Sequence, residues 1–152
     1  MKIQWWSSGL TLLAALGAFS VACAQVLLVT EAEAEASRSA PTRFTAKSVP
    51  APGAPRIILQ TPNISHPVAS PLRIRLRFQP TAPAVILPGT FRVFYGMFEL
   101  DITRRITELA KVSREGLEIS EARLPLGTHS LLIELQDSLG RRGRHNFQFV
   151  VD

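Results

Sequence analysis

Apolar and polar residues alternate most regularly in the stretch 72–78. Every second residue is apolar and the positions between are arginine, so that Leu72, Ile74, Leu76 and Phe78 alternate with Arg73, Arg75 and Arg77. Successive side chains of a strand point to opposite faces of a sheet. The pattern therefore predicts a strand with one buried face and one face in solvent.

The last quarter of the chain shows two more alternating runs, separated by a turn signal. The first run follows Pro125 and Gly127 and carries apolar residues at Leu131, Ile133 and Leu135. An Asp-x-x-Gly turn at 137–140 ends it, and a second run with Phe147 and Phe149 follows. Two alternating runs joined by such a turn predict a β-hairpin.

The remaining patterns are shorter. They predict strands at 56–60 and 90–95, a second arm at 97–100, and a hairpin that pairs 109–112 with 117–119. Pro80, Pro83 and Pro88 indicate a connecting segment, since proline cannot donate to a sheet ladder. Ile102 and Ile106 have helical spacing behind a possible Asp101 N-cap, which predicts a short helical turn near 101–106. Seven to eight short strands without a long helix favour an all-β antiparallel sandwich over any α/β arrangement.

The C-terminal runs also carry a family resemblance. The pattern Leu-x-x-Gly-x-His-x-Leu-x-Ile-x-Leu-x-Asp-x-x-Gly, from Leu124 to Gly140, ends in Phe-x-Phe-x-Val and resembles bacterial immunoglobulin-like domains of exported envelope proteins. The resemblance spans 56–152 and implies an antiparallel immunoglobulin-like sandwich. A scaffold of this kind implies no particular function. The paired cysteines and core tryptophan of antibody domains are missing.

The N-terminus has the features of a targeting segment. Lys2 is followed by an uncharged apolar run, and Ala22-Cys23-Ala24 supplies small residues for cleavage. We expect 1–24 to be a signal peptide and the mature protein to be periplasmic or secreted. Two alternatives are open: lipidation of Cys23 within Ser-Val-Ala-Cys, and an uncleaved anchor over 9–29.

The stretch 25–55 changes composition twice. An acidic run at 31–36 is followed by a segment rich in Pro, Ala and Ser, with Phe44 as its one large apolar residue after the acidic run. Such a stretch buries too little surface to offset its ordering entropy, so we expect a disordered spacer before the domain at 56–152.

Charge and cysteine content exclude several classes of function. The formal net charge of +5 comes mostly from arginines spread through the chain, which indicates no specific nucleic-acid readout. The single cysteine, Cys23, permits no internal disulfide and no zinc-type spacing.

Candidate chemistry is sparse. We expect His66, His129 and His145 to be separate surface histidines, and therefore no metal site. The topology is also similar to periplasmic copper-carrier sandwiches, but those need a histidine at the mature N-terminus, where this chain has Gln25. No nucleophile has a base in a suitable position, so we expect neither an enzyme nor a cofactor.

Two surfaces remain as candidates for binding. Phe94, Leu132 and Val150 fall on the outward positions of three adjacent predicted strands and indicate a partner surface, unless the spacer or a loop covers it. A second set of residues indicates a polyanion or glycan surface: Arg73, Arg75, Arg77, Arg141, Arg142 and Arg144. The alternative for the arginines at 73–77 is that Glu118 on a neighbouring strand pairs with them. We therefore expect a non-catalytic exported domain that binds an envelope protein, with an acidic polymer as the alternative ligand. Its membrane contact would be limited to the N-terminal segment.

Overall fold

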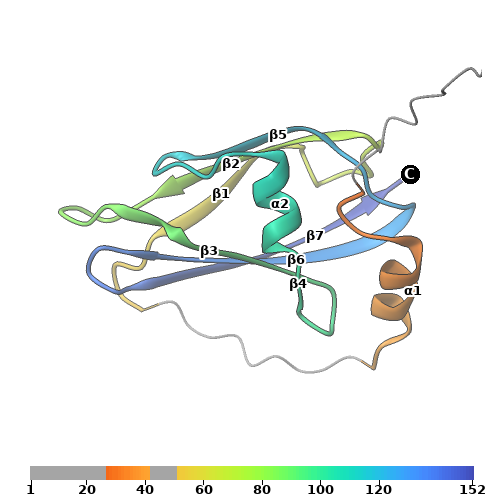
Figure 1. Cartoon of the computed structure of the whole chain (residues 1–152), viewed down its shortest axis with the longest axis horizontal. Coiled ribbons are helices and arrows are strands. Elements are labelled where there is room, and N and C mark those ends of the chain that lie inside the picture. The colour runs from red at the N-terminus through yellow and green to blue at the C-terminus, as the bar shows by residue number, and fades with distance from the viewer. Residues whose placement is uncertain (1–26, 42–50) are drawn as a thin grey trace, which may run out of the picture.

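The computed structural model describes residues 27–41 and 51–152, and it shows the expected all-β sandwich. A three-stranded sheet has the order β1-β2-β5, a four-stranded sheet has the order β4-β3-β6-β7, and every strand pair is antiparallel (Figure 1). The strands are β1 (Arg56–Thr61), β2 (Leu72–Gln79), β3 (Ile86–Tyr95), β4 (Leu100–Asp101), β5 (Gly116–Ala122), β6 (Gly127–Asp137) and β7 (Arg142–Val151). The helices are α1 (Glu31–Ser39) and α2 (Thr103–Leu109).

The two strongest sequence patterns are confirmed. In β2 buried and exposed residues alternate without a break, and the four apolar side chains enter the core. Strands β6 and β7 form the expected hairpin, with continuous pairing from Gly127 opposite Val151 to Gln136 opposite Arg142. The Asp137 side chain accepts the N–H groups of Leu139 and Arg141, which fixes the turn between the two strands.

Pro88 lies inside a strand, although the sequence predicted a connecting segment there. β3 begins at Ile86, before the proline, and pairs with β6 on both sides of it. The register shifts between Leu87 and Arg92, so the proline sits where the ladder is interrupted. A bulge of this kind tolerates the missing N–H.

The prediction for 101–119 is partly wrong. The helical turn exists, but it is α2, with Ile102 at the N-cap and no side-chain cap. Asp101 instead accepts the Thr103 N–H from just outside the helix. The expected hairpin between 109–112 and 117–119 does not form, because Leu109 ends the helix and β5 pairs with β2.

The segment 27–41 differs from the expected disordered spacer. Thr30 and Glu33 form a capping box at the start of α1, and the apolar residues around the cap are completely buried: Leu28, Val29 and Ala34. These three side chains belong to the domain core, which gives the segment the buried surface that its composition appeared to lack. At the other end of the expected spacer, Ala54 donates its N–H to the Ala51 carbonyl in a turn, and Pro55 is buried. The remaining parts of the spacer, 25–26 and 42–50, and the expected signal peptide at 1–24 lie outside the described residues.

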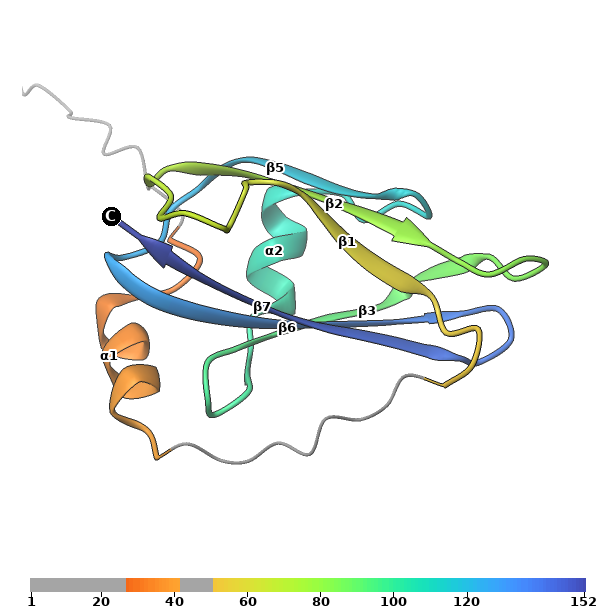
Figure 2. The same cartoon turned by 180° about the vertical axis from the view of Figure 1, so that it is seen from behind.

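The two sides of the sandwich are closed differently. On one side α2 runs from the four-stranded to the three-stranded sheet, between β4 and β5 (Figure 1). On the other side β1 and β7 lie next to each other, each at the edge of its own sheet (Figure 2). Within the described residues, neither helix is long and apolar enough to cross a membrane.

Candidate functional site

The structure brings together two of the three residues predicted for the partner surface. Phe94 on β3 lies directly opposite Leu132 on β6, and both are half-buried on the outer face of the four-stranded sheet. Val150 is 41% exposed, but it pairs with Thr128, four residues along β6 from Leu132. The candidate surface is therefore the Phe94–Leu132 pair, with Val150 at a distance.

A charged row borders this pair. Arg92, Glu134 and Arg144 lie opposite one another on β3, β6 and β7, one outward position away from Phe94 and Leu132. Arg144 forms an ion pair with Glu134 at 2.5 Å. Arg92 forms no ion pair within the described residues, and its guanidinium donates instead to the carbonyls of Gly89 and Phe91.

The arginines of β2 lie on the outer face of the three-stranded sheet, as the alternation predicts. Arg73 and Arg75 lie 3.8 and 3.5 Å from Glu118 of β5, which partly neutralises both. Arg77 lies opposite Gly116, and it forms no ion pair with any residue that the structure describes. Of the three arginines of β2, only Arg77 therefore presents a guanidinium whose charge no carboxylate of the described residues compensates.

The segment 141–144 is not the flexible basic loop that the sequence indicated. Arg141 donates to the fully buried Asp137 carboxylate and to the Thr81 carbonyl, and β7 already begins at Arg142. Burial acts to raise the pKa of Asp137, but the hydrogen bonds from Arg141 and Leu139 outweigh it and hold that pKa below its ordinary value. Of the three arginines in this segment, only Arg142 has no ion pair within the described residues.

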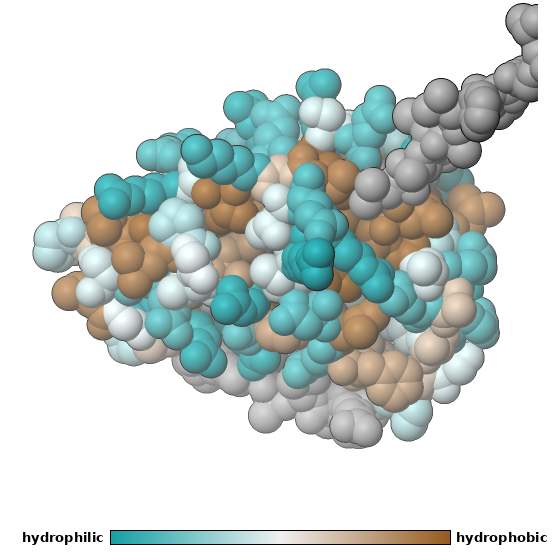
Figure 3. Space-filling view, in the orientation of Figure 1, coloured by the Kyte–Doolittle hydropathy of each residue, from teal (hydrophilic) through white to brown (hydrophobic). Residues whose placement is uncertain are grey.

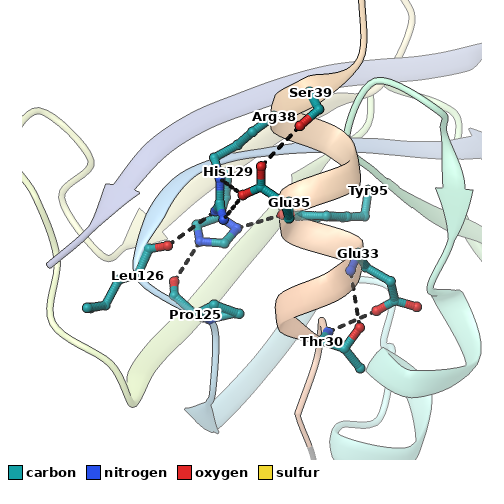
Figure 4. Close-up of polar contacts among 9 residues, drawn as sticks. All are labelled: Thr30, Glu33, Glu35, Arg38, Ser39, Tyr95, Pro125, Leu126 and His129. Carbon is teal, nitrogen blue, oxygen red and sulfur yellow. Dashed lines mark hydrogen bonds and ion pairs between the residues drawn. The ribbon is translucent and has the colours of Figure 1, made fainter.

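His129 is buried, and the prediction of a surface histidine is wrong. It is only 1% exposed, and its ring centroid lies 5.8 Å from that of Tyr95 and 5.7 Å from that of Phe149. Figure 4 shows His129 and Tyr95 next to α1. The Nε2 atom lies 2.8 Å from the Pro125 carbonyl, which can only accept, so Nε2 carries the proton. Nδ1 then accepts from the Tyr95 hydroxyl at 2.8 Å. Burial lowers the pKa of His129, with nearby Arg38 acting in the same direction, and the ring is a satisfied neutral core residue.

Helix α1 is held over this cluster by charges that sequence reasoning missed. Arg105 of α2 donates to both oxygens of Glu33, at 2.7 and 2.8 Å, and to the Leu28 carbonyl at 3.0 Å. The hydrogen bond from Arg105, with those from Thr30, lowers the pKa of Glu33 from 4.5 to about 2. Glu33 thus caps its own helix and ties it to α2. The Thr-x-x-Glu spacing at 30–33 is a sequence signal for the start of the helix. No sequence pattern indicates that Glu33 would pair with Arg105, which lies 72 residues further along the chain.

The other two histidines are exposed, as predicted. The His145 ring lies against Phe147, with 4.2 Å between the ring centroids, while His66 lies in the connection between β1 and β2. In the ranges 27–41 and 51–152 no group of three or more His, Cys, Asp or Glu residues could hold a metal ion.

The side of the molecule that carries α2 presents no single large apolar patch. Figure 3 shows polar residues over α2 and apolar residues toward the two ends of the sandwich. The exposed apolar residues include Val85 and Leu139 at one end, and Leu27 and Leu126 at the other. These exposed apolar side chains form small groups at opposite ends rather than one contiguous patch, so this side adds no candidate site.

Comparisons with known proteins identify no family for this chain. No protein-family model and no curated protein match it. A solved structure, that of CopC from Methylosinus trichosporium OB3b, aligns with 19% sequence identity over 63% of this chain and 93% of that chain, with a TM-score of 0.42. A likeness of this size says nothing about what the present chain binds.

Proposed function

We propose that this chain is an exported, non-catalytic interaction domain of immunoglobulin-like fold that binds another protein of the cell envelope. The observation that carries the proposal is the Phe94–Leu132 pair on the outer face of the four-stranded sheet. Both side chains point away from the core, and each keeps part of its apolar surface in water. Covering the pair with a partner would release that surface from water, at about 25 cal/mol per Å² buried.

The state of the buried polar groups supports a non-catalytic role. His129 is engaged on both ring nitrogens, and Asp137 accepts from the turn and from Arg141. Every buried side-chain nitrogen or oxygen that the structure describes has a hydrogen-bond partner. A general acid or base must reach a substrate, and these groups are committed to the fold.

The alternative is an acidic polymer bound by the arginines. Two guanidinium groups support it, those of Arg77 and Arg142, which form no ion pairs within the described part of the chain. They lie on different sheets of the sandwich, so one polymer would have to wrap around the domain to touch both. The protein partner is therefore the better supported of the two.

The test compares complex formation by the exported chain, two variants within the proposed contact and one control variant, each of which introduces a negative charge. Phe94→Glu and Leu132→Glu each place a carboxylate in the proposed contact, and Ser130→Glu adds the same charge on the same face two residues from Leu132. We measure chemical cross-linking in the cell envelope, and sedimentation of the purified chain at 50 and 500 mM salt.

We expect the cross-linked species or self-association to resist salt and to weaken at least tenfold in Phe94→Glu and Leu132→Glu, with Ser130→Glu close to the parent. Circular dichroism establishes that each variant is folded. Association that disappears at high salt and in the triple variant of Arg73, Arg75 and Arg77 would favour the acidic polymer instead.

A further inference from the structure

The seam between β1 and β7 leaves two strand edges side by side without a common partner. Strand β1 pairs only with β2, and β7 pairs along its length only with β6. Within the described residues, each strand therefore turns one row of backbone N–H and C=O groups toward the seam. Such rows pair readily with an added strand, and natural sheets usually block them. This seam is the side of the sandwich opposite α2 (Figure 2).

The seam is closed at both ends and open between them. At one end the buried Gly143 lies so close to Pro55 that an added Cβ would collide with the Pro55 carbonyl oxygen. At the other end Val68 donates its N–H to the Val150 carbonyl and accepts the Asp152 N–H. Between these contacts lies a groove of about 760 Å³. The contacts at the two ends limit the length of any peptide that the groove can bind.

The groove is apolar with a basic character. Its walls include Ile57, Ile58, Leu59, Ile64 and Phe147. Ile58 is 38% exposed, on the outer face of β1 opposite Arg77. The charged and titratable residues of the lining are Arg56, Arg144 and His145, with no carboxylate among them. Arg144 is paired with Glu134, whereas Arg56 forms no ion pair within the described residues.

We propose that this groove binds an extended peptide segment of another protein, four to six residues long, as an added β-strand. The segment pairs its backbone with the edge of β1 or β7, places alternate apolar side chains beside the exposed Ile58, and offers an acidic side chain to Arg56, which lies on the same face of β1 as Ile58. Main-chain pairing supplies affinity in such complexes, and the pockets for alternate side chains supply specificity. The length follows from β1, whose six residues span about 20 Å at about 3.3 Å each.

The test uses a phage-displayed library of random dodecapeptides, selected on the whole exported chain. We expect the selected peptides to share alternate apolar positions and at least one acidic residue. A synthetic peptide of the best sequence is then titrated into the ¹⁵N-labelled chain, with amide hydrogen exchange measured in the complex. Amides of β1 or β7 that exchange rapidly in the free chain should become protected.

Ile58→Glu should weaken this peptide at least tenfold, because it removes apolar contact and repels the acidic side chain. Leu87→Glu is the matched control, since Leu87 is 40% exposed on β3, outside the groove, and should leave the affinity within twofold. Selected peptides that protect no amide of β1 or β7, or that bind Ile58→Glu as tightly as the parent, overturn the proposal. Peptides that no longer bind Phe94→Glu but still bind Ile58→Glu would occupy the outer face of the four-stranded sheet. The groove proposal and the Phe94–Leu132 proposal can therefore fail independently of each other. Dimerisation of the chain that Ile58→Glu abolishes would make a second copy the occupant, and would also overturn it.

Discussion

The contact between Glu33 and Arg105 gives the most direct test of how α1 is attached. The two side chains meet in a bidentate pair, at 2.7 and 2.8 Å, across 72 residues of sequence. We consider a double-mutant cycle with Glu33→Gln, which removes the charge and keeps an oxygen for the cap, and Arg105→Met, which keeps much of the apolar stem. The cycle isolates the coupling between the two residues from the other effects of each change.

The pKa of Glu33 gives the scale of this coupling. It falls from 4.5 to about 2 in the folded chain, although desolvation acts to raise it, and each pH unit corresponds to about 1.4 kcal/mol, so the net stabilisation of the charged form is about 3.4 kcal/mol. Part of that belongs to Thr30, whose N–H also donates to the Glu33 carboxylate. Both side chains also remain open to solvent, at 25% exposure for Glu33 and 35% for Arg105, and water screens the pair. We therefore expect a coupling of about 1–2 kcal/mol at pH 7.

The pH dependence follows from the direction of the shift. Because the folded-state pKa lies below the ordinary value, the contribution is complete above about pH 4.5 and disappears as the pH falls through about 2. The assay is urea denaturation of the four proteins of the cycle at pH 7, 5 and 3. The coupling should be equal at pH 7 and 5, and smaller at pH 3.

The neighbouring Arg104 supplies the control. It pairs with Glu108 within α2 and is 90% exposed, so the cycle of Arg104→Met with Glu108→Gln should give only about 0.3–0.5 kcal/mol. A Glu33–Arg105 coupling no larger than this, or one that is unchanged at pH 3, would refute the view that the pair anchors α1.

Two further predictions concern the core and the seam. Because burial lowers the pKa of His129 below 6.5, the free energy of unfolding should decrease as the pH falls below about 6.5, and His129→Gln should flatten that decrease in urea midpoints at pH 7 and 5. His145→Gln is measured beside it, because partial desolvation of the His145 ring lowers its pKa too, although the side chain is exposed. An equal flattening in His145→Gln would contradict the assignment to His129. Gly143→Ala should lower the free energy of unfolding by about 1–3 kcal/mol, because its Cβ meets the Pro55 carbonyl. Gly89→Ala, whose Cβ would meet nothing within 4 Å, should be close to neutral in the same denaturation measurement.

Alternation alone predicted the strands that carry a strict period of two. The burial of β2 follows its sequence residue by residue. The prediction that the strand carrying Glu118 lies next to β2 is also confirmed. His129 is a position at which the alternation was not applied, although it holds there. The alternation that turns Leu131 inward also turns His129 inward, two positions before it, but a polar residue type suggested the surface. The pattern of positions was the better guide there, because Tyr95 and Pro125 satisfy both ring nitrogens.

The elements that could not be predicted from the sequence are those whose stability depends on residues far away in the chain. The composition of 27–41 indicated disorder, since it carries few large apolar residues. Its stability comes instead from Leu28 and Val29 in a core built by other segments, and from Arg105 in α2. The error at Leu109 has a similar origin, because helix and strand are both compatible with a short apolar run until the partner of β5 is known.

The buried position of Leu28 and Val29 also bears on the three expectations for the N-terminus. An uncleaved anchor over 9–29 would count both residues within the bilayer, yet both are completely buried in the domain core. The Leu28 N–H donates to the Arg123 carbonyl at 3.1 Å, and Arg105 donates to the Leu28 carbonyl. Withdrawing the two side chains would cost about 1.5–3 kcal/mol each, before the loss of these hydrogen bonds.

An anchor that leaves the fold intact must therefore lie within 9–26, which is 18 residues and close to the shortest length that spans a bilayer. Cleavage after Ala24, or lipidation of Cys23, requires no residue from the core. The structure is compatible with these two outcomes at no cost to the domain, and with the anchor only at its minimum length. If the chain is exported as proposed, N-terminal sequencing of the protein purified from cells should find Gln25 first or a blocked Cys23, and an intact Met1 would count against this reasoning.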